Sequence, residues 1–243
     1  MFDRSSSIPL HLQIKTRILE MVRQTPPEDR AKALFTETAL AAHFGVNRLT
    51  VRQAVTELVR EGVLYRVRGK GTFISPPKVE GQLQHIEHFL EEWREQQHDP
   101  QCEVLFYGWV AVPEPYAEWL QMTPGSKGLC FRRLRRLQGV PLALDVRYLP
   151  PFFGHLLQHE DIVEHPAIDA IVARTKLAIQ RVEMHIEAVA AGVAEAAWLA
   201  VEEGAPLLRR SIIIAVGSGE PAIAGWSLYR GDRYRYRVVL PHA

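Results

Sequence analysis

Apolar residues recur three and four positions apart in the first third of the chain, which is the spacing of one helix face. The segment 9–24 follows this pattern and predicts a first helix. A second helix is predicted from the N-cap residue Thr36 to Phe44, and a third over 48–61, with Asn47 as its N-cap. The chain therefore opens with three short helices.

The second and third predicted helices are joined by a tight turn at Gly45, which makes a helix-turn-helix. In this motif, long donors near the start of the second helix of the pair reach base edges in the major groove of DNA. Arg48 and Arg52 lie four positions apart on the polar face, and arginine can bond guanine O6 and N7 with two N–H groups. Asn47 and Thr50 lie at the N-terminus of that helix, where they suit phosphate oxygens. The alternative is a solvated arginine face on a small helical bundle.

A β-hairpin is predicted directly after the third helix, with strands at 63–67 and 72–75 and the turn RGKG between them. A cationic hairpin next to a helix-turn-helix indicates a wing that contacts the DNA backbone or the minor groove. The predicted wing contacts are Arg66, Arg68, Gly69 and Lys70.

The run from Pro9 to Ser75, above all GVNRLTVRQAV and RGKGTF, resembles the winged helix of GntR-type bacterial transcription regulators. The resemblance implies binding to double-stranded DNA. The family usually has a Pro-Gly turn and then Leu-Pro-Ser-Glu, where this chain has EDRAKA and then Leu34-Phe35-Thr36-Glu37. Thr38 stands where many members have an arginine that some use on DNA, so we do not count it as a DNA contact.

The remainder of the chain reads as a second domain. The run Ser75-Pro76-Pro77-Lys78 predicts a stiff connector, so we divide the chain into 1–75, a linker at 76–82, and 83–243. Leu83, Ile86, Leu90 and Trp93 form a helical stripe. Strands are predicted near 102–112, 128–138, 141–149, 178–189, 206–217, 221–230 and 234–240, and helices near 114–122, 166–174 and 193–203. This order predicts an α+β domain around a mostly antiparallel sheet.

Three blocks of this domain resemble the UTRA effector domain of the HutC branch of GntR regulators. They are FRRLRRLQGVP from Phe131, YLPP from Tyr148, and Gly219-Glu220-Pro221 followed by YRGDRY from Tyr229. The resemblance implies a chorismate-lyase-like fold that binds a small effector.

One face of the strand around 129–137 carries Phe131, Arg133 and Arg135, because side chains alternate along a strand. Two like charges so close favour an anion or a carboxylate between them, and guanidinium groups suit carboxylate and phosphate. A solvated basic face is the alternative, which we prefer for Arg132 and Arg136 on the other face.

Asp145 on the next strand either contacts a polar effector, as Glu at this place commonly does in the family, or pairs with Arg133 or Arg135. Ile223 stands where relatives that sense sugar phosphates have an acidic residue, and Glu95-Gln96-Gln97 replaces small and basic residues. Both changes argue against an amino-sugar phosphate. The predicted effector contacts are Arg133, Arg135, Asp145, Ile223 and Tyr229, and we interpret Arg230–Arg233 as a charged hairpin turn.

The remaining chemistry excludes several classes of protein. Glu183, His185 and Glu187 alternate on one strand face, but three such ligands are too collinear to close a metal site, so a solvated face is favoured. We find no nucleophile elbow, metal motif or phosphate loop, so neither an enzyme nor a cofactor is predicted. Two cysteines argue against a disulfide framework, and the sequence has no apolar run of membrane length and no signal peptide.

The charge distribution agrees with a DNA-binding head. The formal net charge is +1, but residues 1–77 carry +5 and residues 78–243 carry −4. The sequence therefore predicts a cytoplasmic regulator, most simply a repressor, that binds a palindromic operator as a homodimer and responds to an anionic effector. The alternative is a lyase-like enzyme domain that acts on a carboxylated metabolite and is fused to a DNA-binding head.

Overall fold

A computed structural model describes residues 7–26, 34–67, 71–75, 78–82, 100–137, 139–163 and 165–239. The chain divides into two compact units, Met1–Lys78 and Val79–Ala243. The wing tip 68–70 and the predicted helix after residue 83 lie outside the described residues. Among the residues that are described, none of the helices has the length and apolarity needed to cross a membrane.

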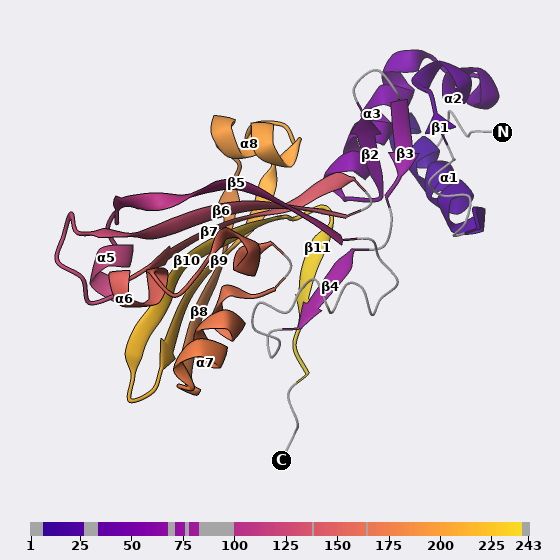
Figure 1. The fold of residues 1–243 in the computed structure, drawn as a ribbon. Coiled ribbons are helices and arrows are strands. Elements are labelled where there is room, and N and C mark those ends of the chain that lie inside the picture. The colour runs from indigo at the N-terminus through magenta and orange to yellow at the C-terminus, as the bar shows by residue number, and fades with distance from the viewer. Residues whose placement is uncertain are drawn as a thin grey trace. The chain divides into compact units, whose positions relative to one another are not determined.

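The first unit is a winged helix-turn-helix, as predicted (Figure 1). Its elements are α1 (Leu10–Gln24), β1 (Leu34–Phe35), α2 (Glu37–Phe44), α3 (Arg48–Arg60), β2 (Leu64–Val67) and β3 (Gly71–Ile74). The three strands pair antiparallel in the order β1-β3-β2, and β2 and β3 form the hairpin of the wing.

Local sequence sets the ends of the two helices of the motif. The Thr36 side chain accepts a hydrogen bond from the backbone N–H of Ala39 at 3.0 Å and caps α2. Gly45 ends α2 at φ 65°, a left-handed conformation that glycine adopts without strain. Buried apolar side chains from all three helices and the wing then form one core: Ile14, Ile18, Leu40, Ala41, Val51, Ala54, Val55, Leu58, Leu64 and Ile74.

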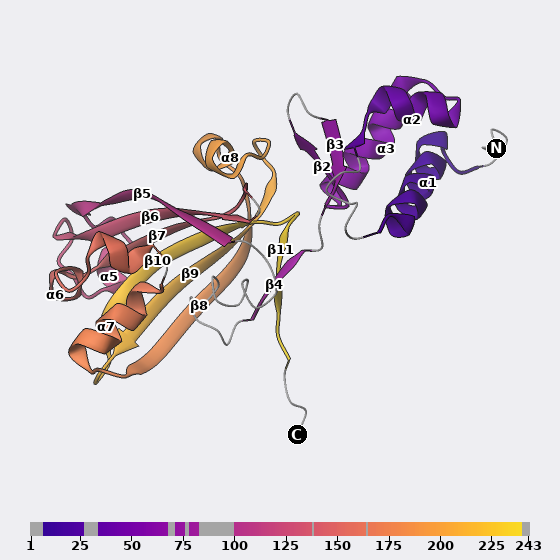
Figure 2. The ribbon, with the colours of Figure 1, turned by 45° about the vertical axis from the view of Figure 1, so that its right-hand side comes forward.

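The second unit is built on a six-stranded antiparallel sheet in the order β5-β6-β7-β10-β9-β8 (Figure 2). The strands are β5 (Pro100–Ala111), β6 (Lys127–Leu137), β7 (Val140–Leu149), β8 (Ile179–Ala190), β9 (Pro206–Val216) and β10 (Glu220–Arg230). The helices are α5 (Tyr116–Trp119), α6 (Pro151–Gly154), the short 3-10 helix η2 (His159–Ile162), α7 (Ala167–Thr175) and α8 (Val193–Leu199). The α+β prediction is confirmed.

Helices pack on both faces of this sheet. On one face, α6, η2 and α7 cover an apolar cluster that includes Phe131, Ile212 and Ile223. On the other face, α8 packs against residues such as Leu134, Leu144 and Leu228 of the central strands. Because side chains alternate along each strand, a single strand supplies both layers.

A two-stranded parallel sheet of β4 (Val79–Gln82) and β11 (Tyr234–Arg237) completes this unit. The predicted linker 76–82 thus includes a strand of the second unit. The last strand pairs with β4 rather than with β10, so Gly231–Arg233 form a turn but not the predicted hairpin. The physical reason is that β4 offers β11 a partner from a distant part of the chain.

Candidate DNA-binding face and effector site

The N-terminus of α3 presents the two predicted base-reading arginines. The side chains of Arg48 and Arg52 are 61% and 55% exposed. The carboxamide oxygen of Asn47 accepts from the Thr50 backbone N–H at 2.8 Å and from its hydroxyl at 2.9 Å. Asn47 therefore caps α3 through Thr50 in its first turn, and the contact of both residues with phosphate stays a prediction.

The base of the wing adds a third cation to this face. Arg66 on β2 donates to the Thr56 hydroxyl of α3 at 2.9 Å, which ties the wing to the recognition helix. The remaining predicted wing contacts, Arg68, Gly69 and Lys70, lie outside the described residues.

The register of the large sheet aligns the predicted effector contacts. One row of directly opposite residues crosses all six strands and consists of Val104, Arg133, Asp145, Ser227, Arg210 and Ile186. The next row contains Cys102, Arg135, Ala143, Tyr229, Leu208 and Ala188. Opposite residues of an antiparallel sheet share a face, so both rows lie on the same side.

These polar side chains are fully enclosed. Arg133, Arg135 and Asp145 are 2%, 1% and 0% exposed, so the solvated-face interpretation is wrong for both arginines. Arg135 NH2 donates to Asp145 Oδ1 at 2.5 Å, while Arg133 NH2 lies 3.5 Å from Asp145 Oδ2. Asp145 thus pairs with both arginines, and its contact with Arg135 is the closest of its ion pairs.

Arg147 completes the surroundings of the carboxylate. Its NH2 lies 3.9 Å from Asp145 Oδ1 and donates to the Ser227 hydroxyl at 3.0 Å. Its NH1 donates to the Trp226 carbonyl at 2.7 Å. Burial by itself would raise the pKa of Asp145, but the charges of Arg135, Arg147 and Arg133 outweigh burial and hold that pKa well below its usual range. Asp145 is therefore ionised at neutral pH.

Tyr229 joins this cluster to an aromatic group. Its hydroxyl accepts from Arg135 at 3.2 Å, and its ring stacks on Tyr234 of β11 with ring centroids 4.1 Å apart. The guanidinium of Arg210 lies 5.6 Å from the Tyr229 ring centroid. Burial would raise the pKa of Tyr229, but the neighbouring charges of Arg210 and Arg135 lower it.

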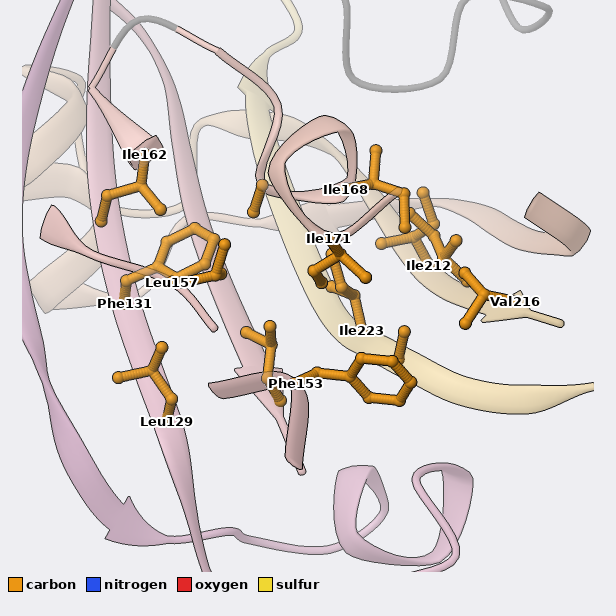
Figure 3. Close-up of a cluster of buried hydrophobic side chains, with 14 residues drawn as sticks. Leu129, Phe131, Phe153, Leu157, Ile162, Ile168, Ile171, Ile212, Val216 and Ile223 are labelled. Atoms are coloured by element: carbon orange, nitrogen blue, oxygen red, sulfur yellow. The ribbon is translucent and has the colours of Figure 1, made fainter. Parts of the chain in front are cut away.

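Ile223 lies on the same sheet face, in the neighbouring apolar cluster (Figure 3). It is 0% exposed, and Ile168 and Ile171 of α7 lie with it in that cluster. The structure therefore brings Arg133, Arg135, Asp145 and Tyr229 together and places Ile223 in the apolar part of the face.

The residues that we expected to be solvated lie elsewhere. Arg132 is exposed above the Phe106 ring, and Arg136 lies 3.3 Å from Glu103. On the edge strand β8, His185 Nε2 lies 3.1 Å from Glu183 Oε1. We placed Arg230 in a charged turn, but it is buried. It forms two hydrogen bonds with Asp232, and its NH1 donates to the Leu199 carbonyl at the end of α8, which covers this end of β10.

Sequence analysis missed Ser227 and Arg210 as members of the polar cluster. Ser227 lies directly across from Asp145, and Arg210 lies directly across from Ser227, in the row of Arg133 and Asp145. The only signal for them is the cross-strand register, which follows from the pairing of strands and not from the pattern of any one strand.

Comparison with known proteins identifies both units. The family model described as "Bacterial regulatory proteins, gntR family" matches residues 10–74, and the model of the UTRA domain matches residues 95–235. The transcriptional repressor NagR of Bacillus subtilis is 30% identical over 96% of both chains. The mannosyl-D-glycerate transport/metabolism system repressor MngR of Escherichia coli is 31% identical over 73% of both chains.

A solved structure shows the same fold. PhnF from Mycobacterium smegmatis matches with a TM-score of 0.63 at 22% identity, over 95% of this chain and all of that one. The named relatives are transcription regulators, which gives the lyase-like alternative no support. With both family descriptions matched in order, the chain belongs to the GntR family of bacterial transcription regulators, in the HutC branch, with a C-terminal UTRA effector domain.

Proposed function

We propose that this protein is a cytoplasmic repressor that binds a palindromic operator as a homodimer and is controlled by an anionic effector in the UTRA domain. One winged helix covers only a few base pairs, and two-fold pairing aligns two recognition helices with two half-sites. The proposed DNA contacts are Asn47, Arg48, Thr50, Arg52, Arg66, Arg68, Gly69 and Lys70. The proposed effector contacts are Arg133, Arg135, Asp145, Tyr229 and, at the apolar end, Ile223.

The observation that carries the effector proposal is the bonding of Arg133. Its NH1 donates to the Ile162 carbonyl at 3.0 Å, but its buried Nε has no hydrogen-bond partner among the described residues. Asp145 Oδ2 also has no hydrogen-bond donor among the described residues, and its contact there is the ion pair with Arg133. Buried polar atoms without hydrogen bonds are costly, so both atoms are suited to a ligand.

These two atoms define the chemistry of the ligand. A carboxylate or phosphate group would accept from Arg133, and a hydroxyl or amine beside it would donate to Asp145. Apolar residues continue along the sheet face beyond Phe131, whose ring lies 5.0 Å from the Arg133 guanidinium carbon. We therefore propose an effector with an anionic end and an apolar or weakly polar body.

A thermal-shift screen with sugar phosphates, amino acids, organic acids and fatty acids identifies the ligand class, because a ligand of the native state raises the melting temperature. Calorimetry then compares the unmodified chain with Arg133→Gln/Arg135→Gln. We expect this variant to lose effector binding and to keep its operator affinity without effector.

The matched control is Arg132→Gln/Arg136→Gln, which removes the same charge from the opposite face of the same strand. Unimpaired binding by the Arg133/Arg135 variant, or equal loss in the control, would move the site elsewhere. Sedimentation of the full chain at micromolar concentration tests the dimer, and a species with the mass of one chain would contradict it.

A further inference from the structure

One carboxylate lies among the proposed DNA-contacting arginines. Glu37 is the first residue of α2, and its side chain is 19% exposed. Its Oε2 accepts from Arg52 Nε at 3.0 Å, lies 3.0 Å from Arg52 NH2, and lies 3.9 Å from Arg48 NH2. Its Oε1 lies 3.6 Å from Arg66 NH2 at the base of the wing. A single side chain of α2 therefore faces cations from both the recognition helix and the wing.

We propose that Glu37 is a positioning residue for operator recognition. It fixes Arg52 in its reading geometry, and its charge lowers the affinity of this face for DNA of arbitrary sequence. The inference rests on the proposed role of Arg52 as a base reader.

The hydrogen-bonding capacity of the guanidinium allows Arg52 to bond Glu37 and a base together. A guanidinium has five N–H donors; Glu37 accepts from the one on Nε, and its ion pair with NH2 occupies at most one more. At least three donors remain on the two terminal nitrogens, which is enough for the pair of bonds that guanine accepts. An arginine held in this way loses less side-chain freedom when it binds a base than an unrestrained one does.

The carboxylate also acts on DNA that offers no matching base. A negative charge beside phosphates is unfavourable for every sequence, and only a sequence that bonds the oriented Arg52 regains that loss. The penalty of the charge is common to all sequences, so the orientation of Arg52 is what widens the difference between operator and other DNA, and that difference defines specificity.

The charge of Glu37 suits the first turn of α2, but the fold of the unit does not rest on it. The Thr36 side chain caps α2 independently of Glu37, and the apolar core behind it is formed by residues such as Leu40 and Val51. The arginine partners are more than half exposed in two cases, and exposed ion pairs contribute little to folding stability. Removal of the charge should therefore leave the unit folded.

The test uses the full chain and two duplexes of equal composition, one selected from a random pool by the unmodified chain and one shuffled. Glu37→Gln should tighten binding to the shuffled duplex about fivefold, the size of one charge interaction at close range in water. The selected duplex gains the same relief from charge but loses the orientation of Arg52, so the ratio of selected to shuffled affinity should fall, with loss of preference at the base read by Arg52. Glu37→Asp keeps the charge but shortens the side chain. The affinity for the shuffled duplex should therefore stay low, while the base preference falls.

The matched control is Glu61→Gln, because Glu61 pairs with Lys15 at 2.5 Å in the same unit, away from Arg52. It should leave the affinity ratio unchanged. An unchanged ratio in Glu37→Gln, or an equal drop in the control, overturns the inference. Full base preference in Glu37→Asp also overturns the inference.

Arg52→Ala separates the role of Glu37 from the role of Arg52 as a base reader. If this variant keeps base preference, the assignment of Arg52 as a reader fails. If it loses preference while the Glu37 variants do not, only the role of Glu37 fails.

Discussion

Asp145→Asn is the sharpest perturbation that this structure offers. The change removes one negative charge with little change in shape, at a side chain that is 0% exposed and faces Arg135, Arg133 and Arg147 at 2.5, 3.5 and 3.9 Å. Removal of one partner from a buried ion pair costs about 3–5 kcal/mol, because the charges that remain are not compensated. Since whole domains are stable by about 5–15 kcal/mol, this is a large part of the total.

The assay follows from the distribution of tryptophan. All five tryptophans lie after residue 78, so their fluorescence reports unfolding of the second unit alone. Urea titration of the unmodified chain and of Asp145→Asn gives the difference in unfolding free energy at pH 7. The control is Glu103→Gln, which breaks the exposed pair with Arg136 on the same sheet and should cost no more than about 1 kcal/mol.

The pH dependence gives a second readout. The folded pKa of Asp145 lies below its unfolded value, so its contribution is fully present above the unfolded pKa of about 3.9 and is lost as pH falls below that value. The stability difference between the two proteins should therefore be constant from pH 7 to 5 and shrink below pH 4. A stability difference under about 1 kcal/mol at pH 7, or one that does not shrink below pH 4, would refute the view that Asp145 neutralises the arginine cluster.

Three further outcomes are expected. Arg52→Ala should weaken operator binding by roughly 1–3 kcal/mol and relax preference at one base pair, which a binding series over single-base operator variants measures. Lys70→Ala should weaken binding to all duplexes alike and flatten the salt dependence by about one counterion; a loss confined to one base position would contradict this. Gly81→Ala should destabilise the second unit by about 1–3 kcal/mol in urea, since a Cβ there would lie 2.6 Å from Tyr234 Cζ, and Tyr234→Leu should relieve part of the cost.

The pattern of single strands and helices was predictable because periodicity is local. The strand predicted at 128–138 is observed at Lys127–Leu137, and the helix predicted at 166–174 is observed at Ala167–Thr175. The helix predicted at 193–203 ends early, at Leu199, because Ala200 takes a left-handed conformation with φ 52°. Nothing in the side-chain pattern marks that turn, since alanine favours helix.

Contacts between distant segments were not predictable in the same way. The pairing of β11 with β4 joins residues more than 150 positions apart, and both strands are too short for periodicity to reveal a partner. The sequence suggested that Asp145 could pair with Arg133 or Arg135, and it left open that both pairs form at once. The register that places Asp145 directly opposite Arg133, with Arg135 next to it on the same face, decides this.

The bonding of Arg133 also indicates how an effector could act on more than its own site. One guanidinium nitrogen, NH1, is committed to carbonyl oxygens of Ile162 and His165, in the segment that runs from η2 to α7. Ile162 itself packs in the apolar cluster beneath α7, with Ile168 and Ile171. An anion at the proposed site would draw on the same guanidinium that holds this covering segment, so its affinity would depend on where the segment lies. By linkage, such a ligand would bias the position of the segment by the same free energy, which is the differential binding that a ligand-controlled regulator requires.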